Sequence, residues 1–182
     1  MATNVDMDTW FAIRRIQEIL ATNVLLQPRH PLQQSAFIEI VVRLHELLQK
    51  ANSIKRRISF TDDVRLFPQV TDITDAVREC RDAVCHVHAN GHFIAPDGSP
   101  KQRGQRLPQG QRFFKMTFNV GYGKANLLHT PQFTIESEYE DDVCFFYGAH
   151  RLYLKRHIIR AVQEAAVALA PEGPPQRPTP RQ

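Results

Sequence analysis

Apolar residues recur at three- and four-residue steps in four stretches of the chain, which predicts four amphipathic helices. These stretches are residues 8–26, 32–52, about 71–90 and 152–170. Helices with one apolar stripe bury it against each other, so the pattern predicts a mainly α fold, an antiparallel helical bundle. The second stretch carries the clearest stripe, made of Phe37, Ile40, Val41, Leu44, Leu47, Leu48 and Ala51.

The pattern changes between the third and fourth helices. Residues 95–111 (APDGSPKQRGQRLPQGQ) are typical of a loop, whereas 112–120 and 143–147 are rich in Phe, Val and Tyr, which favours strands. We therefore expect a small β insert at about residues 112–150, carried by a single helical domain that spans residues 1–170. The tail, residues 171–182, is rich in proline and polar side chains and is predicted to be disordered.

Composition narrows the class of protein. The 182 residues are 42% hydrophobic and 23% charged, which is an ordinary globular mixture. No apolar run is long enough to span a bilayer, and the N-terminus lacks the features of a signal peptide, so we expect a cytoplasmic protein without a membrane partner. The three cysteines, Cys80, Cys85 and Cys144, show no disulfide framework and are interpreted as free thiols.

Charge is distributed unevenly along the chain. The net charge is +4, and no acid occurs between Asp97 and Glu136. Lys101, Arg103 and Arg106 lie in the predicted loop, where they could follow an RNA backbone. Phe113 and Phe114 could stack on bases, but core positions in a strand are the favoured interpretation. The acidic block at 136–142 is interpreted as a solvated face, or one that pairs with the basic block of a second subunit.

The candidate chemistry lies at the end of the third helix, in Arg81, Asp82 and His86. A guanidinium can hold a phosphate through two parallel hydrogen bonds and stabilise charge that builds on it, while an imidazole can move a proton near neutral pH. RNA supplies its own nucleophile, the 2′-hydroxyl, so such a site needs no metal and no cofactor. A competing Arg-x5-His spacing occurs at Arg151 and His157, which we interpret as a chance match because no polar residue follows that arginine.

The stretch from Asp72 to His86, DITDAVRECRDAVCH, resembles the Arg-x4-6-His motif of the HEPN superfamily, which also lies late in a bundle helix. The resemblance implies a metal-independent endoribonuclease that acts as a homodimer, in phage defence or beside an antitoxin partner. It makes Arg81 and His86 catalytic and Asp82 the polar residue that orients them, with aspartate in place of the commoner asparagine. Five residues on a straight helix separate two side chains by about 140°. The pair can therefore converge only if the helix loosens near His86 or if a second subunit completes the site.

Other interpretations remain open. The chain could be a non-catalytic HEPN-like module that binds RNA, nucleotide or a partner protein, or a structural subunit of a larger complex. Cys85, His86, His88 and His92 could bind zinc, but their spacing matches no recognised structural pattern, so we expect no metal. His88 is interpreted instead as a second substrate-binding residue or a residue of the dimer interface.

Overall fold

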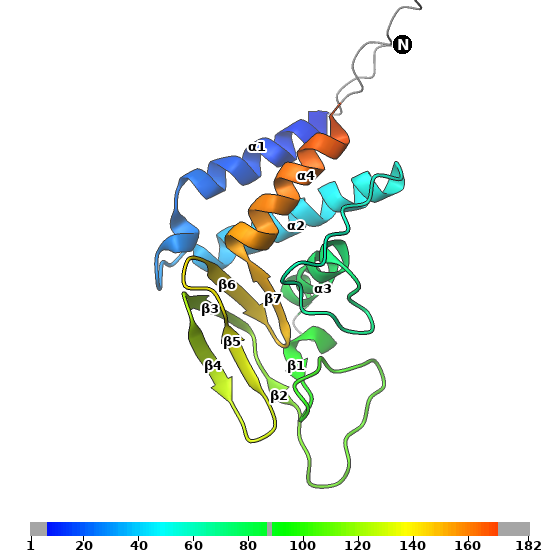
Figure 1. The fold of residues 1–182 in the computed structure, drawn as a ribbon, viewed down its shortest axis with the longest axis vertical. Coiled ribbons are helices and arrows are strands. Elements are labelled where there is room, and N and C mark those ends of the chain that lie inside the picture. Colours follow the sequence, from blue (N-terminus) through cyan, green and yellow to red (C-terminus); the bar gives the residue numbers. More distant parts are fainter. Residues whose placement is uncertain (1–6, 87–88, 171–182) are drawn as a thin grey trace, which may run out of the picture.

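The computed structural model describes residues 7–86 and 89–170 (Figure 1). Its α-helices are α1 (Met7–Ala21), α2 (Gln33–Ser53), α3 (Ile73–Cys85) and α4 (Arg160–Leu169). Its strands are β1 (Phe93–Ile94), β2 (Phe114–Lys115), β3 (Phe118–Tyr122), β4 (Ala125–His129), β5 (Thr134–Ser137), β6 (Val143–Tyr147) and β7 (His150–Tyr153). No helix in this described part combines the length and the apolar composition needed to cross a membrane.

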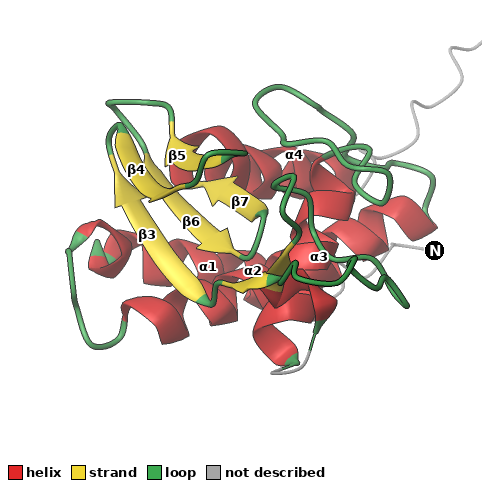
Figure 2. Cartoon of the chain, turned by 90° about the horizontal axis from the view of Figure 1, so that it is seen from below, coloured by secondary structure: helices red, strands yellow, loops and turns green. Residues whose placement is uncertain are grey.

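The predicted mainly α bundle with a small β insert is wrong. Helices account for 44% of the structure and strands for 19%, in three small antiparallel sheets ordered β1-β2, β3-β6-β7 and β4-β5. Figure 1 shows the sheets below α1, α2 and α4, with α3 beside β7, and Figure 2 shows that the helices cover one face of the β3-β6-β7 sheet. Phe37 of α2 stacks on Phe145 of β6 with ring centroids 4.6 Å apart. The strands are therefore a layer of the main core and not an insert beside it.

Strand β6 explains why the sheet was underestimated. All five of its residues are buried, because helices cover one face of the strand and side chains of the β4–β5 hairpin cover the other. Phe145 and Tyr147 join the helical core, whereas Cys144 and Phe146 join a second cluster with Tyr153. A strand buried on both faces shows no alternation of polar and apolar residues, so its sequence does not reveal which faces are covered.

Helix α3 begins as the sequence predicts and ends earlier. Asp72 is its N-cap, and its carboxylate accepts a hydrogen bond from the Asp75 N–H at 3.0 Å. Arg57 donates to both carboxylates and ties the start of the helix to the preceding connection. The predicted end near Asn90 is wrong, because α3 ends at Cys85, His86 is extended, and Asn90–His92 form a separate 3-10 turn.

The last predicted helix, residues 152–170, is divided in the structure. Strand β7 continues to Tyr153, a π-helical turn covers Leu154–Ile159, and α4 follows. Asp142 holds the start of this helical segment, where its carboxylate accepts hydrogen bonds from the Lys155 N–H at 3.0 Å and the Arg156 N–H at 3.2 Å. The predicted disordered tail, residues 171–182, lies outside the described residues.

Candidate functional site

The predicted catalytic residues lie at the C-terminal end of α3. The Arg81 and Asp82 side chains are 36% and 47% exposed, and Arg81 Nη1 donates to Asp82 Oδ1 at 3.0 Å. This hydrogen bond is the main reason that the pKa of Arg81 is raised. Arg81 Nε is buried and has no partner among the described residues. The guanidinium is thus reachable from solvent, with part of its charge balanced by the neighbouring carboxylate.

His86 is exposed and lies immediately after the last residue of α3. Its backbone is extended, at φ −130° and ψ 104°, while its N–H still donates to the Asp82 carbonyl at 3.1 Å. The angle of about 140° expected on a straight helix therefore no longer applies, because the helix stops before His86. The Arg81 and His86 side chains make no direct hydrogen bond in the described part of the chain.

A buried histidine supports the backbone of His86. Nε2 of His92 lies 3.2 Å from the His86 carbonyl oxygen, and the Ala89 N–H donates to that same oxygen at 2.8 Å. A carbonyl oxygen only accepts, so His92 Nε2 must carry the hydrogen. The sequence pointed to His92 only as a possible zinc ligand, whereas the structure makes it a support for the chain at the candidate site.

His45 of α2 was not among the predicted site residues, and it lies near Arg81 where α2 packs on α3. Burial lowers the pKa of His45, and the positive charge of Arg81 lowers it further. His45 Nδ1 is buried without a hydrogen-bond partner among the described residues. His45 follows Leu44 on the flank of the apolar stripe, and that position beside the core was the one available signal. The His45 imidazole thus adds a polar group between α2 and α3 near Arg81.

The structure excludes the competing pair, Arg151 and His157, from a substrate site. The Arg151 side chain is largely buried and Nη2 binds Glu138 Oε1 at 2.7 Å. His157 is fully buried, and its Nδ1 accepts a hydrogen bond from the Tyr153 N–H at 3.1 Å. Burial lowers the pKa of His157 to about 4. Both side chains belong to the structure of β7 and the segment that follows it.

Among residues 7–86 and 89–170, no three His, Cys, Asp or Glu side chains are grouped closely enough to hold a metal ion. His88, named as a possible zinc ligand and as a substrate-binding residue, lies outside the described residues. Cys85 is exposed, and Cys80 and Cys144 are buried free thiols.

The basic loop leaves β1 and returns in β2, and it projects from the body of the fold (Figure 1). Lys101 Nζ lies 5.0 Å from the ring centroid of Phe93 and 4.9 Å from that of Phe113. Arg103 and Arg106 are exposed. Phe113 and Phe114 were interpreted as core residues of a strand. This is wrong for Phe114, which is 42% exposed.

Four acids of the predicted acidic block are exposed, as expected of a solvated face, whereas Asp142 is buried, and three members of the block also pair within the chain. Glu138 binds Arg151, and both Asp141 and Asp142 bind Arg156. The Asp142 side chain is completely buried. Glu138 and Asp141 remain 45% and 64% exposed in these pairs, so pairing of the block with a second subunit stays a prediction.

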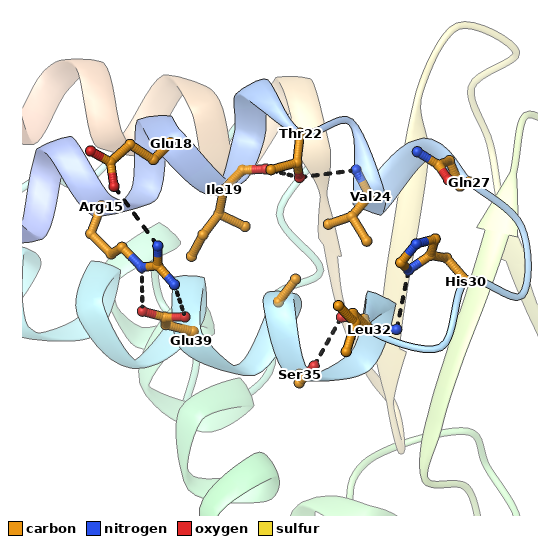
Figure 3. A pocket seen from close by; sticks show the side chains of 11 residues that line it. Arg15, Glu18, Ile19, Thr22, Val24, Gln27, His30, Leu32, Ser35 and Glu39 are labelled. Atoms are coloured by element: carbon orange, nitrogen blue, oxygen red, sulfur yellow. Dashed lines mark hydrogen bonds and ion pairs between the residues drawn. The ribbon is translucent and has the colours of Figure 1, made fainter.

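A cavity of about 430 Å³ between α1 and α2 was not expected from the sequence (Figure 3). Its arginine, Arg15, is already bound to two acids: Nε lies 2.9 Å from Glu39 Oε1 and Nη1 lies 3.8 Å from Glu18 Oε2. His30 Nδ1 accepts a hydrogen bond from the Leu32 N–H. The polar groups of this cavity mostly satisfy one another, and none of its lining residues belongs to α3.

No protein-family model, curated protein or solved structure matches this chain. The resemblance to HEPN therefore depends on the motif in residues 72–86, since the bundle expected with it is not observed.

Proposed function

We propose that this chain is a metal-independent endoribonuclease with a HEPN-type site at Arg81, Asp82 and His86. The observation that supports this most directly is the end of α3 immediately before His86. It leaves an exposed imidazole just beyond a helix whose last two turns carry a half-exposed guanidinium. In the proposed site the phosphate binds Arg81, and the exposed imidazole of His86, five residues further along the chain, moves the proton.

The proposed reaction is an internal transfer. The RNA 2′-oxygen attacks the adjacent phosphorus, and the bond from phosphorus to the 5′-oxygen of the next nucleotide breaks. His86 assists the proton movement from the 2′-hydroxyl to the leaving oxygen, and Arg81 stabilises the negative charge on the phosphoryl oxygens. The products are a 2′,3′-cyclic phosphate and a 5′-hydroxyl. Asp82 orients the Arg81 guanidinium through their hydrogen bond.

The proposed biological unit is a homodimer, because the resemblance implies two motifs that face each other across an interface. The proposed setting is the cytoplasm, in phage defence or in a toxin–antitoxin pair with an antitoxin partner. Lys101, Arg103 and Arg106 are proposed to bind the substrate backbone.

One observation favours a second function, a non-catalytic module that binds RNA, nucleotide or a partner protein. The Arg81–Asp82 pair places a carboxylate where a substrate phosphate would bind, and like charges repel. In that case RNA or a partner would bind without being cleaved.

The test is incubation of the purified protein with tRNA and single-stranded RNA in EDTA. We expect the wild type to cleave, and His86→Ala and Arg81→Ala to lose cleavage by at least a hundredfold while keeping their fold. His129→Ala and Arg14→Ala are matched controls, because each removes an exposed residue of the same type elsewhere and should leave cleavage unchanged. Equal cleavage by His86→Ala would overturn the site assignment. If the wild type binds these RNAs but does not cleave them, with or without an added partner protein, the non-catalytic binding module is favoured.

A further inference from the structure

Strands β1 and β2 form a two-stranded ribbon at the base of the basic loop, and its surface combines lysines with aromatic rings. We call Phe93, Lys101, Phe113, Phe114 and Lys115 the basic ribbon. Phe93 pairs with Lys115 and Ile94 pairs with Phe114, so Phe93 and Lys115 share one face of the ribbon. On that face Lys101 Nζ lies between the rings of Phe93 and Phe113, and Lys115 Nζ lies 5.8 Å from the Phe93 ring centroid.

The opposite face of the ribbon carries an aromatic ring in water. Phe114 is 42% exposed, and its ring meets Phe133 edge-on with centroids 5.8 Å apart and planes at 76°. The edge contact with Phe133 fixes the ring and leaves part of its surface open. Lysine ammonium groups already cover Phe93 and Phe113, so Phe114 is the ring of the ribbon that a ligand can reach.

The charge around Phe114 selects an anionic ligand. Arg103, Arg106 and Arg112 are exposed in the same loop, and no acid occurs in the sequence between Asp97 and Glu136. The Asp97 carboxylate is already occupied by the backbone N–H and hydroxyl of Ser99. A ring available for stacking, beside a loop that carries exposed arginines, fits single-stranded nucleic acid, which presents a flat base and a phosphate at every nucleotide.

We propose that the basic ribbon binds single-stranded RNA, with an unpaired base stacked on Phe114 and phosphates on the loop arginines Arg103, Arg106 and Arg112. Single strands are required because a base in a duplex has both faces covered by its neighbours. The proposal depends on the proposed function only for the choice of RNA as the polymer. The ribbon is also tied to the candidate site, since Phe93 directly follows His92, whose side chain supports the His86 carbonyl. An RNA strand held on the ribbon is thus bound next to the segment that carries the proposed catalytic imidazole.

The test measures the affinity of a labelled single-stranded RNA 12-mer by fluorescence anisotropy, in EDTA and in the His86→Ala background to prevent turnover. We expect Phe114→Ala to weaken binding about 5- to 100-fold, as loss of one stacked base does. Phe114→Tyr should retain the affinity because it keeps the ring. Phe11→Ala is the matched control, because Phe11 is an exposed phenylalanine on α1, and it should bind like the parent. Removing Arg103 and Arg106 together should weaken binding and flatten its salt dependence.

The proposal is overturned if Phe114→Ala binds like the parent, if Phe11→Ala loses as much affinity, or if duplex RNA binds as tightly as the single strand. Tighter binding of a single-stranded DNA 12-mer would overturn the choice of RNA. The outcome is separable from that of the proposed function. Phe114-dependent binding by a wild type that cleaves nothing supports the ribbon and refutes the nuclease, whereas cleavage with binding that does not need Phe114 does the reverse.

Discussion

The replacement Asp142→Ala tests a buried carboxylate that accepts four hydrogen bonds. The buried carboxylate accepts hydrogen bonds from the backbone N–H groups of Val143 at 2.8 Å, Lys155 at 3.0 Å and Arg156 at 3.2 Å. It also binds Arg156 Nη1 at 3.1 Å. It therefore joins the end of the acidic block to the start of the helical segment that follows β7.

The size of the effect follows from these contacts. Loss of a helix cap destabilises a protein by about 1 kcal/mol, and breaking a buried ion pair by about 3–5 kcal/mol. Arg156 retains Asp141 at 2.9 Å, so its charge is not left without a partner and the lower end applies. We expect Asp142→Ala to lower the free energy of unfolding by about 3 kcal/mol, which corresponds to roughly 6–12 °C in Tm for a chain of this size.

The assay is urea unfolding followed by circular dichroism, with Asp142→Asn and Asp141→Ala as controls. The asparagine keeps one acceptor oxygen and the shape of the side chain, so we expect an intermediate loss. Asp141→Ala removes the exposed partner of Arg156 and should move the midpoint little. The reasoning is refuted if Asp142→Ala is no less stable than Asp141→Ala.

Three further outcomes are expected. Burial lowers the pKa of both His150 and His157 to about 4, so between pH 6.5 and 4 the unfolded chain binds protons that the fold does not. The free energy of unfolding should therefore fall as the pH drops through this window, by up to about 3 kcal/mol per histidine. Urea midpoints measured from pH 6.5 to 4 should fall more in the wild type than in His150→Gln and His157→Gln, and an equal fall would contradict this. Gly148→Ala should destabilise the fold by more than about 2 kcal/mol in thermal melts, because Gly148 has φ +56° and a Cβ there would collide with the Gly91 carbonyl; Gly110→Ala, also at positive φ but in open space, should lose less. Asp82→Asn keeps an acceptor for Arg81 and removes a negative charge about 6 Å from the proposed phosphate, so RNA titrations should show roughly threefold tighter binding, and weaker binding would contradict this electrostatic role.

The helices were largely predictable because each has one buried face. The apolar stripe of residues 32–52 corresponds to α2 (Gln33–Ser53), and the first stretch corresponds to α1 followed by a short 3-10 turn at Val24–Leu26. The start of the third helix was expected at about residue 71, and the structure places its N-cap at Asp72. Such local signals depend on residues close in sequence, which is why a single chain reveals them.

The division of the last helix was not predictable in the same way. Leu152 and Leu154 fit the apolar stripe of a helix, yet Leu152 lies in β7 and pairs with Phe145 of β6. The tight turn at Gly148 brings β7 back along β6, and this pairing with the preceding strand outweighs the local helical preference. The end of α3 was missed for a related reason, because Asn90 and Gly91 form a turn that packs on the helix and do not end it.

The candidate site shows how the corrected fold bears on the proposed chemistry. The position of His86 depends on His92, whose ring lies 5.9 Å from the ring of Tyr147 in β6. Gly91 allows this packing, since a Cβ there would lie 3.3 Å from the Cβ of Ala83 in α3. The group that supports the proposed catalytic imidazole therefore packs on the sheet, in the part of the chain that the bundle prediction treated as an insert. A substitution such as His92→Phe would keep an aromatic ring against Tyr147 and remove the hydrogen bond to the His86 carbonyl. If that support positions His86, cleavage of RNA should fall at least tenfold while binding to the basic ribbon is unchanged, and equal losses of both would show that His92 only stabilises the fold.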